Sequence, residues 1–97
     1  MKILEEEDYI GNPKESGYRS YHITIKYPIL YGETRKDVVC EVQIRTLAMN
    51  FWSTIEHSLK YKYEGKIPEE LKYKLQSSAE IAFNLDKEMD YIRNELF

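Results

Sequence analysis

The sequence has little of what marks a secreted or membrane-spanning chain. Its single cysteine, Cys40, cannot form an internal disulfide, which favours a reducing cytoplasm. No apolar run approaches the roughly 18 residues that a membrane-spanning helix requires. Residues 1–8 are acidic rather than basic, unlike the start of a secretory leader. We therefore expect a cytoplasmic chain with no membrane partner.

Excess positive charge and the common catalytic fingerprints are also absent. The net charge is −3, whereas general nucleic-acid binders use a basic surface to displace counterions. No stable nucleic-acid partner is expected. The sequence contains no P-loop, no dinucleotide-binding fingerprint and no nucleophile elbow, and it has no low-complexity tract or internal repeat.

What is present indicates a small folded unit. The chain has 97 residues, which fits one small domain or a piece of a larger one. Hydrophobic residues make up 42% and charged residues 32%, so intrinsic disorder is not expected. Nine tyrosines offer flat rings with polar tips, which suit a half-wet cleft as well as a core or a strand.

The first half of the chain predicts a loop followed by a β-hairpin. Turn formers cluster within residues 11–17, and residues 18–31 are rich in β-branched and aromatic side chains. Pro28 indicates a strand end or an edge position. A polar turn is expected over residues 32–37 and a second strand over 38–46, with one oily face and one polar face.

The second half predicts two helices. Thr46 is the expected N-cap of the first, and Gly65 and Pro68 separate it from the second. The second helix carries a heptad seam, in steps of four and three, made by Leu71, Leu75, Ser78, Ala82, Leu85, Met89, Ile92 and Leu96. This seam favours packing within the same domain, and subunit contact is the alternative. Because a two-stranded hairpin is barely stable alone, we expect it to be part of a larger sheet.

The polar face of the second strand is the first candidate site. Glu41, Gln43 and Arg45 alternate along it, so their side chains lie in a row on a rigid element. A carboxylate can hold Mg²⁺, and a guanidinium can bind phosphate oxygens. A solvated strand face with a Glu–Arg pair is the alternative, and spacing alone favours it.

Four further residues suit nucleotide binding. Lys14 lies in the Gly/Pro-containing loop, where an ammonium can reach a phosphate, and Tyr18 and His22 share one face by strand alternation. Asn50 lies near the start of the first helix, where its amide can pair with a base edge. Taken one at a time, each is more often an ordinary surface residue.

Three linked segments carry a resemblance to a known family. Residues 8–22 (DYIGNPKESGYRSYH) closely resemble the guanine-nucleotide loop of the RelA/SpoT synthetase domain. Residues 41–46 (EVQIRT) are similar to that family's catalytic strand, and residues 48–52, 55–57 and 61–62 match the helix after it. The resemblance implies an α+β, nucleotidyltransferase-like mixed sheet with flanking helices. Residues 1–97 would form the C-terminal half of that domain, in the branch of small alarmone synthetases.

The resemblance also implies an activity: transfer of pyrophosphate from ATP to the ribose 3′-hydroxyl of GTP or GDP. Glu41 would be catalytic and bind Mg²⁺. The guanine nucleotide would be held by Lys14, Tyr18, His22, Gln43 and Asn50. A homo-oligomer through the C-terminal helices is expected. Because the family's preceding half supplies the ATP site and a second metal carboxylate, we expect these 97 residues alone to be inactive. A non-catalytic guanine-nucleotide-binding or oligomerisation module is the alternative.

Overall fold

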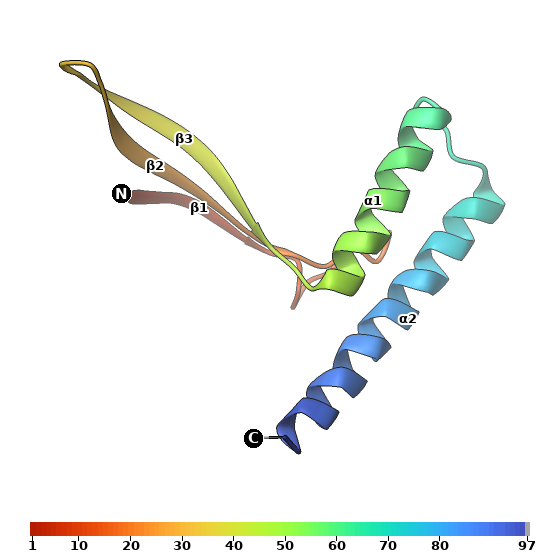
Figure 1. Ribbon diagram of the computed structural model, residues 1–97. Coiled ribbons are helices and arrows are strands. Elements are labelled where there is room, and N and C mark those ends of the chain that lie inside the picture. The colour runs from red at the N-terminus through yellow and green to blue at the C-terminus, as the bar shows by residue number, and fades with distance from the viewer. Residues whose placement is uncertain (97) are drawn as a thin grey trace.

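A three-stranded antiparallel sheet and two helices make up the chain (Figure 1). The computed structural model describes residues 1–96. The elements in chain order are β1 (Lys2–Asp8), β2 (Tyr21–Tyr31), β3 (Thr34–Ile44), α1 (Leu47–Lys62) and α2 (Glu69–Asn94). In the sheet β2 lies between β1 and β3, and the α+β class expected from the sequence is confirmed.

Strand β1 is not among the predicted elements, because the sequence pattern predicts a loop and then strands only from residue 18 onward. Four of its seven residues are acidic, from Glu5 to Asp8, and acidic residues are depleted in strands. Pairing with β2 nevertheless satisfies its backbone, from Lys2 opposite Lys26 to Asp8 opposite Tyr21. The register shifts between Ile3 and Glu5, which marks a bulge. Long-range pairing therefore overrides the local preference.

The hairpin of β2 and β3 is longer than predicted. Its connection is two residues, between the paired Tyr31 and Thr34, rather than the polar turn predicted over 32–37. Gly32 has a φ of 66°, as the first loop position of a type II′ hairpin turn requires. Strand β1 accompanies β2 only to Lys26, so Pro28 lies on an open edge, as predicted.

Both helices begin where the sequence places them. The Thr46 hydroxyl accepts a hydrogen bond from the Met49 N–H at 3.1 Å, which caps α1 as predicted. Gly65 has a φ of 82° in the connection, and Pro68 precedes the first residue of α2. The two helices lie side by side, and the C-terminal half of α2 extends beyond α1 (Figure 1).

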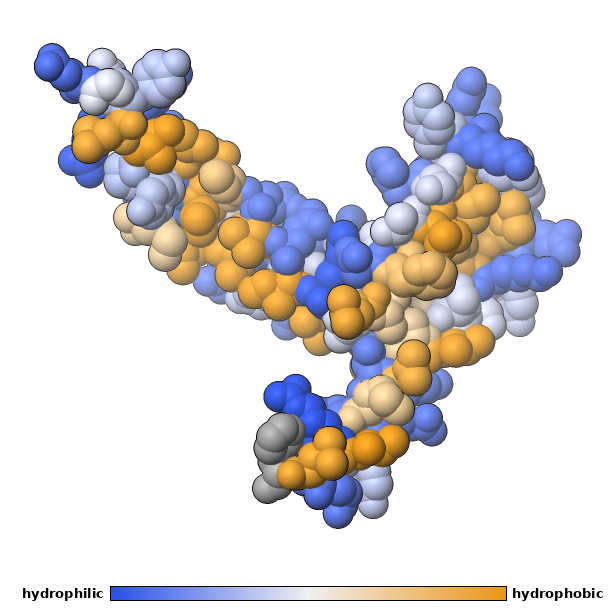
Figure 2. Space-filling model, viewed as in Figure 1, coloured by the Kyte–Doolittle hydropathy of each residue, from blue (hydrophilic) through white to orange (hydrophobic). Residues whose placement is uncertain are grey.

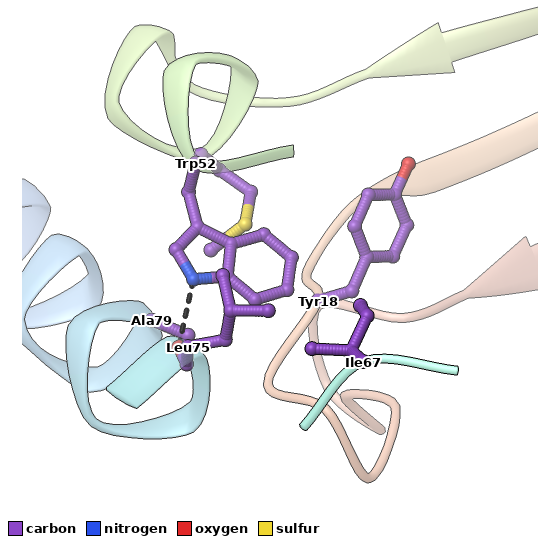
Figure 3. Packing of buried hydrophobic residues seen from close by; sticks show 6 residues of the cluster. Tyr18, Trp52, Ile67, Leu75 and Ala79 are labelled. Atoms are coloured by element: carbon purple, nitrogen blue, oxygen red, sulfur yellow. Dashed lines mark hydrogen bonds between the residues drawn. The ribbon is translucent and has the colours of Figure 1, made fainter. Parts of the chain in front are cut away.

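The hydrophobic core is small and lies where the base of the sheet meets the helices. Its buried members are Tyr18, Met49, Trp52, Ile67, Leu75 and Ala79 (Figure 3). The indole N–H of Trp52 donates to the Leu75 carbonyl at 2.8 Å, which ties α1 to α2. Figure 2 shows apolar side chains exposed along the sheet and on the helices.

The chain is extended for its size. Its radius of gyration is 17.6 Å, whereas a compact domain of about 100 residues has a value of about 13 Å. Its accessible surface is 8051 Å², against about 5,800 Å² expected for a compact protein of this mass. Neither α1 nor α2 is long and apolar enough to cross a membrane.

Candidate functional site

The polar face of the sheet brings Glu41, Gln43 and His22 together. The Gln43 amide donates to Glu41 Oε1 at 2.7 Å, and His22 Nδ1 lies 3.6 Å from the same oxygen. His22 pairs with Gln43 across β2 and β3, which sets this arrangement. The Glu41 side chain is 48% exposed, so its carboxylate is open to a ligand.

Tyr18 and Arg45 extend this arrangement into a chain of polar contacts. Arg45 Nη1 donates to Tyr18 Oη at 2.8 Å, and the same oxygen lies 3.0 Å from His22 Nε2. Because a guanidinium only donates, the Tyr18 proton is free to bond His22 Nε2. If the Tyr18 hydroxyl donates to Nε2, the ring hydrogen of His22 is on Nδ1, facing Glu41. The contacts run without a break from Arg45 to Glu41.

Arg45 also joins the sheet to the first turns of α1. Its Nε donates to Asn50 Oδ1 at 3.1 Å, and its Nη1 donates to Ser53 Oγ at 3.2 Å. The predicted binding residue Asn50 therefore lies in the same cluster as Tyr18. Ser53 was missed, and its position three residues after Asn50 on a helix was the available signal. Arg45 was recognised on the strand face but was not among the predicted guanine-nucleotide contacts.

Lys14 lies over two aromatic rings. Its ammonium is 4.9 Å from the ring centroid of Tyr9 and 5.5 Å from that of Tyr18, within the range of cation–π attraction. The Lys14 N–H donates to the Tyr18 carbonyl at 3.1 Å, so the loop folds back on itself. The Tyr9 ring also meets His22 edge-on, with centroids 5.2 Å apart. Tyr9 was missed because it precedes the turn and belongs to no predicted strand face.

The ring of Tyr18 is more buried than its predicted position on a polar face suggests. Only 8% of the residue is exposed, and the ring packs beside Trp52 in the core (Figure 3). Its hydroxyl alone reaches the polar contacts. Ser20, which strand alternation would place on the same face as Tyr18 and His22, is fully buried, and its hydroxyl donates to the Ile44 carbonyl at 3.2 Å. Strand alternation fails here because β2 begins only at Tyr21.

Strand β1 adds negative charge beside the site. Glu7 is paired with His22, and its carboxylate accepts a hydrogen bond from the Tyr9 hydroxyl. That hydrogen bond raises the pKa of Tyr9, and desolvation and the charges of Glu7, Glu5 and Glu41 raise it further. The Tyr9 phenol is thus held neutral beside an acidic strand.

The donor set around Glu41 fits magnesium bound together with a phosphate ligand. Within residues 1–96 no three His, Cys, Asp or Glu side chains gather into a metal site. Glu41 thus offers a single carboxylate. Mg²⁺ binds through one or two carboxylates and takes its remaining ligands from water and substrate phosphates. The exposed Glu41 would supply one carboxylate ligand of such a site.

Comparison with known proteins gives a consistent answer. Residues 1–66 match the family model described as a region found in RelA / SpoT proteins. The chain is 55% identical over 94 residues to GTP pyrophosphokinase YjbM of Bacillus subtilis and 41% identical over 96 residues to GTP pyrophosphokinase YwaC of the same organism. These alignments cover 97% and 99% of the chain.

Solved structures agree with this likeness. The crystal structure of small alarmone synthetase 1 from Bacillus subtilis bound to its product pppGpp matches 97% of the chain, with a TM-score of 0.91 and 55% identity. The structure of small alarmone synthetase 2 from the same organism matches with a TM-score of 0.93 and 41% identity. The chain spans about half the length of these relatives, 44% of YjbM and 46% of YwaC.

Proposed function

Because the chain belongs to the family defined by the region found in RelA and SpoT proteins, we propose that it forms the acceptor-nucleotide half of a GTP pyrophosphokinase. The reaction is (p)ppGpp synthesis. The ribose 3′-oxygen of GTP or GDP attacks the β-phosphorus of ATP, the bond between the α,β-bridging oxygen and that phosphorus breaks, and AMP leaves. The observation that carries this proposal is the cluster of Glu41, His22 and Arg45, linked through the Tyr18 hydroxyl, in which the Glu41 carboxylate is exposed.

Lys14 and the rings beneath it would receive the guanine nucleotide. The Lys14 ammonium covers the rings of Tyr9 and Tyr18, and its flexible side chain can turn away toward a phosphate. That movement would uncover aromatic surface on which guanine can stack. Phosphate binding and base stacking would then occur together. This account reconciles the low exposure of Tyr18 with its proposed role as the stacking residue.

Gln43, Asn50 and His22 would fix the orientation of the nucleotide. The Asn50 oxygen is engaged by Arg45, which turns its two amide hydrogens outward as donors for a base or ribose. Gln43 uses one amide hydrogen on Glu41 and retains its carbonyl oxygen. His22 lies between Tyr18 and Glu41, within reach of the acceptor ribose or its phosphates.

Glu41 is the proposed catalytic residue. Its carboxylate is exposed and held by Gln43 and His22, so it can bind Mg²⁺ and accept the proton of the 3′-hydroxyl. When bound, the metal would neutralise charge on the transferred phosphates. Substituting this carboxylate by an amide should therefore abolish transfer while the guanine-nucleotide contacts remain.

The test uses the chain and a chimera. With ATP, GTP and Mg²⁺, the 97-residue chain should bind GTP in calorimetry but form no pppGpp. A chimera in which it replaces the matching 44% of YjbM should form product, and Glu41→Gln should abolish this. Formation of pppGpp by the 97-residue chain alone would contradict the proposal that this chain is only the acceptor-nucleotide half of the enzyme. A folded chimera that binds GTP without turnover would instead favour a non-catalytic nucleotide-binding module.

A homo-oligomer through α2 is the second part of the proposal. Leu85, Met89 and Ile92 continue the heptad seam along the C-terminal half of α2, and they are 46%, 49% and 52% exposed. The seam adjoins an apolar groove of about 420 Å³ between α1 and α2. A second copy offers the same apolar helix and would cover the seam by isologous pairing.

We also place the reaction in the cytoplasm. Cys40 is a free thiol on the exposed oily face of β3. A free exposed thiol persists best in a reducing compartment.

A further inference from the structure

The nucleotide-binding loop contacts both the candidate site and helix α2. Lys14 and the Tyr18 hydroxyl face the candidate site, and His22 continues this side into β2. Glu15, Gly17 and Arg19 contact α2. Helix α2 therefore supports the loop on the side away from the candidate site, although α2 carries none of the proposed nucleotide contacts.

Three contacts fasten the loop to α2. The Gln76 amide donates to the Glu15 carbonyl at 2.9 Å, and the Arg19 guanidinium lies 3.7 Å from the ring centroid of Phe83. Gly17 approaches α2 so closely that an added Cβ would lie 2.5 Å from the Cβ of Ala79. Its φ of 98° also suits glycine alone, so the backbone at Gly17 is fitted to this helix.

The same face of α2 also fastens the end of the catalytic strand. The Thr46 hydroxyl, which caps α1 directly after Arg45, donates to Asp86 Oδ2 at 2.7 Å. Gln76, Ala79, Phe83 and Asp86 follow one another in steps of three, four and three. They therefore lie on one face of the helix, beside the heptad seam.

We propose that this face of α2, made by Gln76, Ala79, Phe83 and Asp86, positions the guanine-nucleotide loop and the start of α1 and so sets the affinity for the acceptor nucleotide. These are positioning residues, since they act through Glu15, Gly17, Arg19 and Thr46. The inference rests on the proposed function. Its physical basis is pre-organisation: a loop held in its binding conformation loses less entropy when the ligand binds.

The test measures GTP binding by the chain with isothermal titration calorimetry in the presence of Mg²⁺. Gln76→Glu keeps the shape of the side chain but removes its donor, and GTP should bind about three- to tenfold more weakly. Gln76→Lys restores a donor and should recover most of the affinity. Asn84→Ala, on another face of α2, is the control and should change nothing, because Asn84 is exposed and away from the loop.

A second variant tests the close contact. Ala79→Leu places bulk against Gly17 and should weaken GTP binding more than tenfold. Ala79 is only 2% exposed, so far-UV circular dichroism must first establish that this variant folds. If Ala79→Leu does not fold, the Gln76→Glu and Gln76→Lys variants test the proposal by themselves, since Gln76 is exposed.

The outcomes separate the two proposals. Unchanged GTP affinity in Gln76→Glu, with normal binding by the parent chain, would overturn the role of α2 alone. Equal loss in Gln76→Glu and Gln76→Lys would also overturn it, because the donor would then be irrelevant. If the parent chain binds no GTP, the proposed function fails first, and this inference with it.

Discussion

Arg45 is the residue that joins the most parts of the candidate site. Its guanidinium reaches Tyr18, Asn50 and Ser53 at 2.8, 3.1 and 3.2 Å, from the loop to α1. A planar fork can serve several acceptors at fixed angles, whereas an ammonium is a compact point charge. The site is therefore organised by the shape of this cation as much as by its charge.

The first prediction concerns this fork. Arg45→Lys should lower the free energy of unfolding by about 1–2 kcal/mol, because at least one of the three hydrogen bonds is lost. Urea unfolding followed by Trp52 fluorescence measures the change. The matched control is Arg35→Lys near the tip of the hairpin, which should be neutral. Equal values for the two variants would contradict the role of Arg45 as a structural junction.

The second prediction concerns the tyrosines that face β1. Hydrogen bonds to Glu7 and Glu6 raise the pKa of Tyr9 and that of Tyr21 above the ordinary value of 10.0. A raised pKa in the folded state means that this contribution to stability is present below pH 10.0 and is lost as pH rises through the folded value. Glu7→Gln should lower the pKa of Tyr9.

Nuclear magnetic resonance of ¹³C-labelled tyrosine, titrated from neutral to alkaline pH, resolves each phenol. Glu6→Gln is the matched control, because it should lower the pKa of Tyr21 and leave that of Tyr9 unchanged. If Glu7→Gln left Tyr9 titrating as before, the assigned hydrogen bond would be wrong.

At the scale of elements, the junction of β3, α1 and α2 depends on one hydroxyl. Thr46 Oγ1 accepts from the Met49 N–H and donates to Asp86, so a single side chain caps α1 and holds α2. The strand and the helix that carry Glu41 and Asn50 are thereby fixed to a third element. A change at this point should affect stability more than the loss of an exposed hydroxyl farther along α1.

The third prediction concerns the hydroxyl of Thr46. Thr46→Ala should cost about 1–2 kcal/mol in the free energy of unfolding, since it removes both the cap and the bond to Asp86. Thr46→Ser should retain most of the stability. Thr54→Ala provides a control on the exposed side of α1, where the hydroxyl bonds only the Asn50 carbonyl. Chemical denaturation compares the three, and indistinguishable Thr46→Ala and Thr54→Ala variants would contradict the prediction.

At the scale of the whole molecule, the chain exposes more surface than a compact monomer of its mass. The excess over the expected value is about 2,200 Å², more than a standard protein–protein interface buries. Figure 2 shows apolar side chains along the sheet and the helices, and the C-terminal half of α2 stands clear of the rest (Figure 1). Such a shape is typical of a chain that packs against further protein surface.

The fourth prediction tests one such surface. If a second copy covers the α2 seam, Leu85→Glu and Ile92→Glu should convert the oligomer to monomer, because each buries a charge in an apolar contact. Sedimentation velocity measures the change. Leu30→Glu, at the exposed tip of the hairpin, is the control and should leave the assembly intact. A parent chain that is monomeric at all concentrations would contradict the proposed oligomer.

The sequence by itself determined those features that depend on near neighbours. Alternation placed Glu41 and Gln43 on one face of β3, and the cap at Thr46 and the breaks at Gly65 and Pro68 bounded the helices. The family resemblance came from the same kind of local information, three short motifs in order. These features survive because strand and helix periodicity is set by the backbone alone.

The features that depend on contacts between distant segments were decided only by the tertiary structure. An acidic segment forms β1 because β2 pairs with it. The ring of Tyr18 is buried, with only its hydroxyl at the polar contacts, because it packs beside Trp52 before β2 begins. The hydrogen bond that connects α2 to the loop joins Gln76 to Glu15, which lie 61 positions apart in the sequence. Contacts at such separation leave no periodic trace in a sequence, because they depend on where whole elements come to lie rather than on the spacing of residues within one.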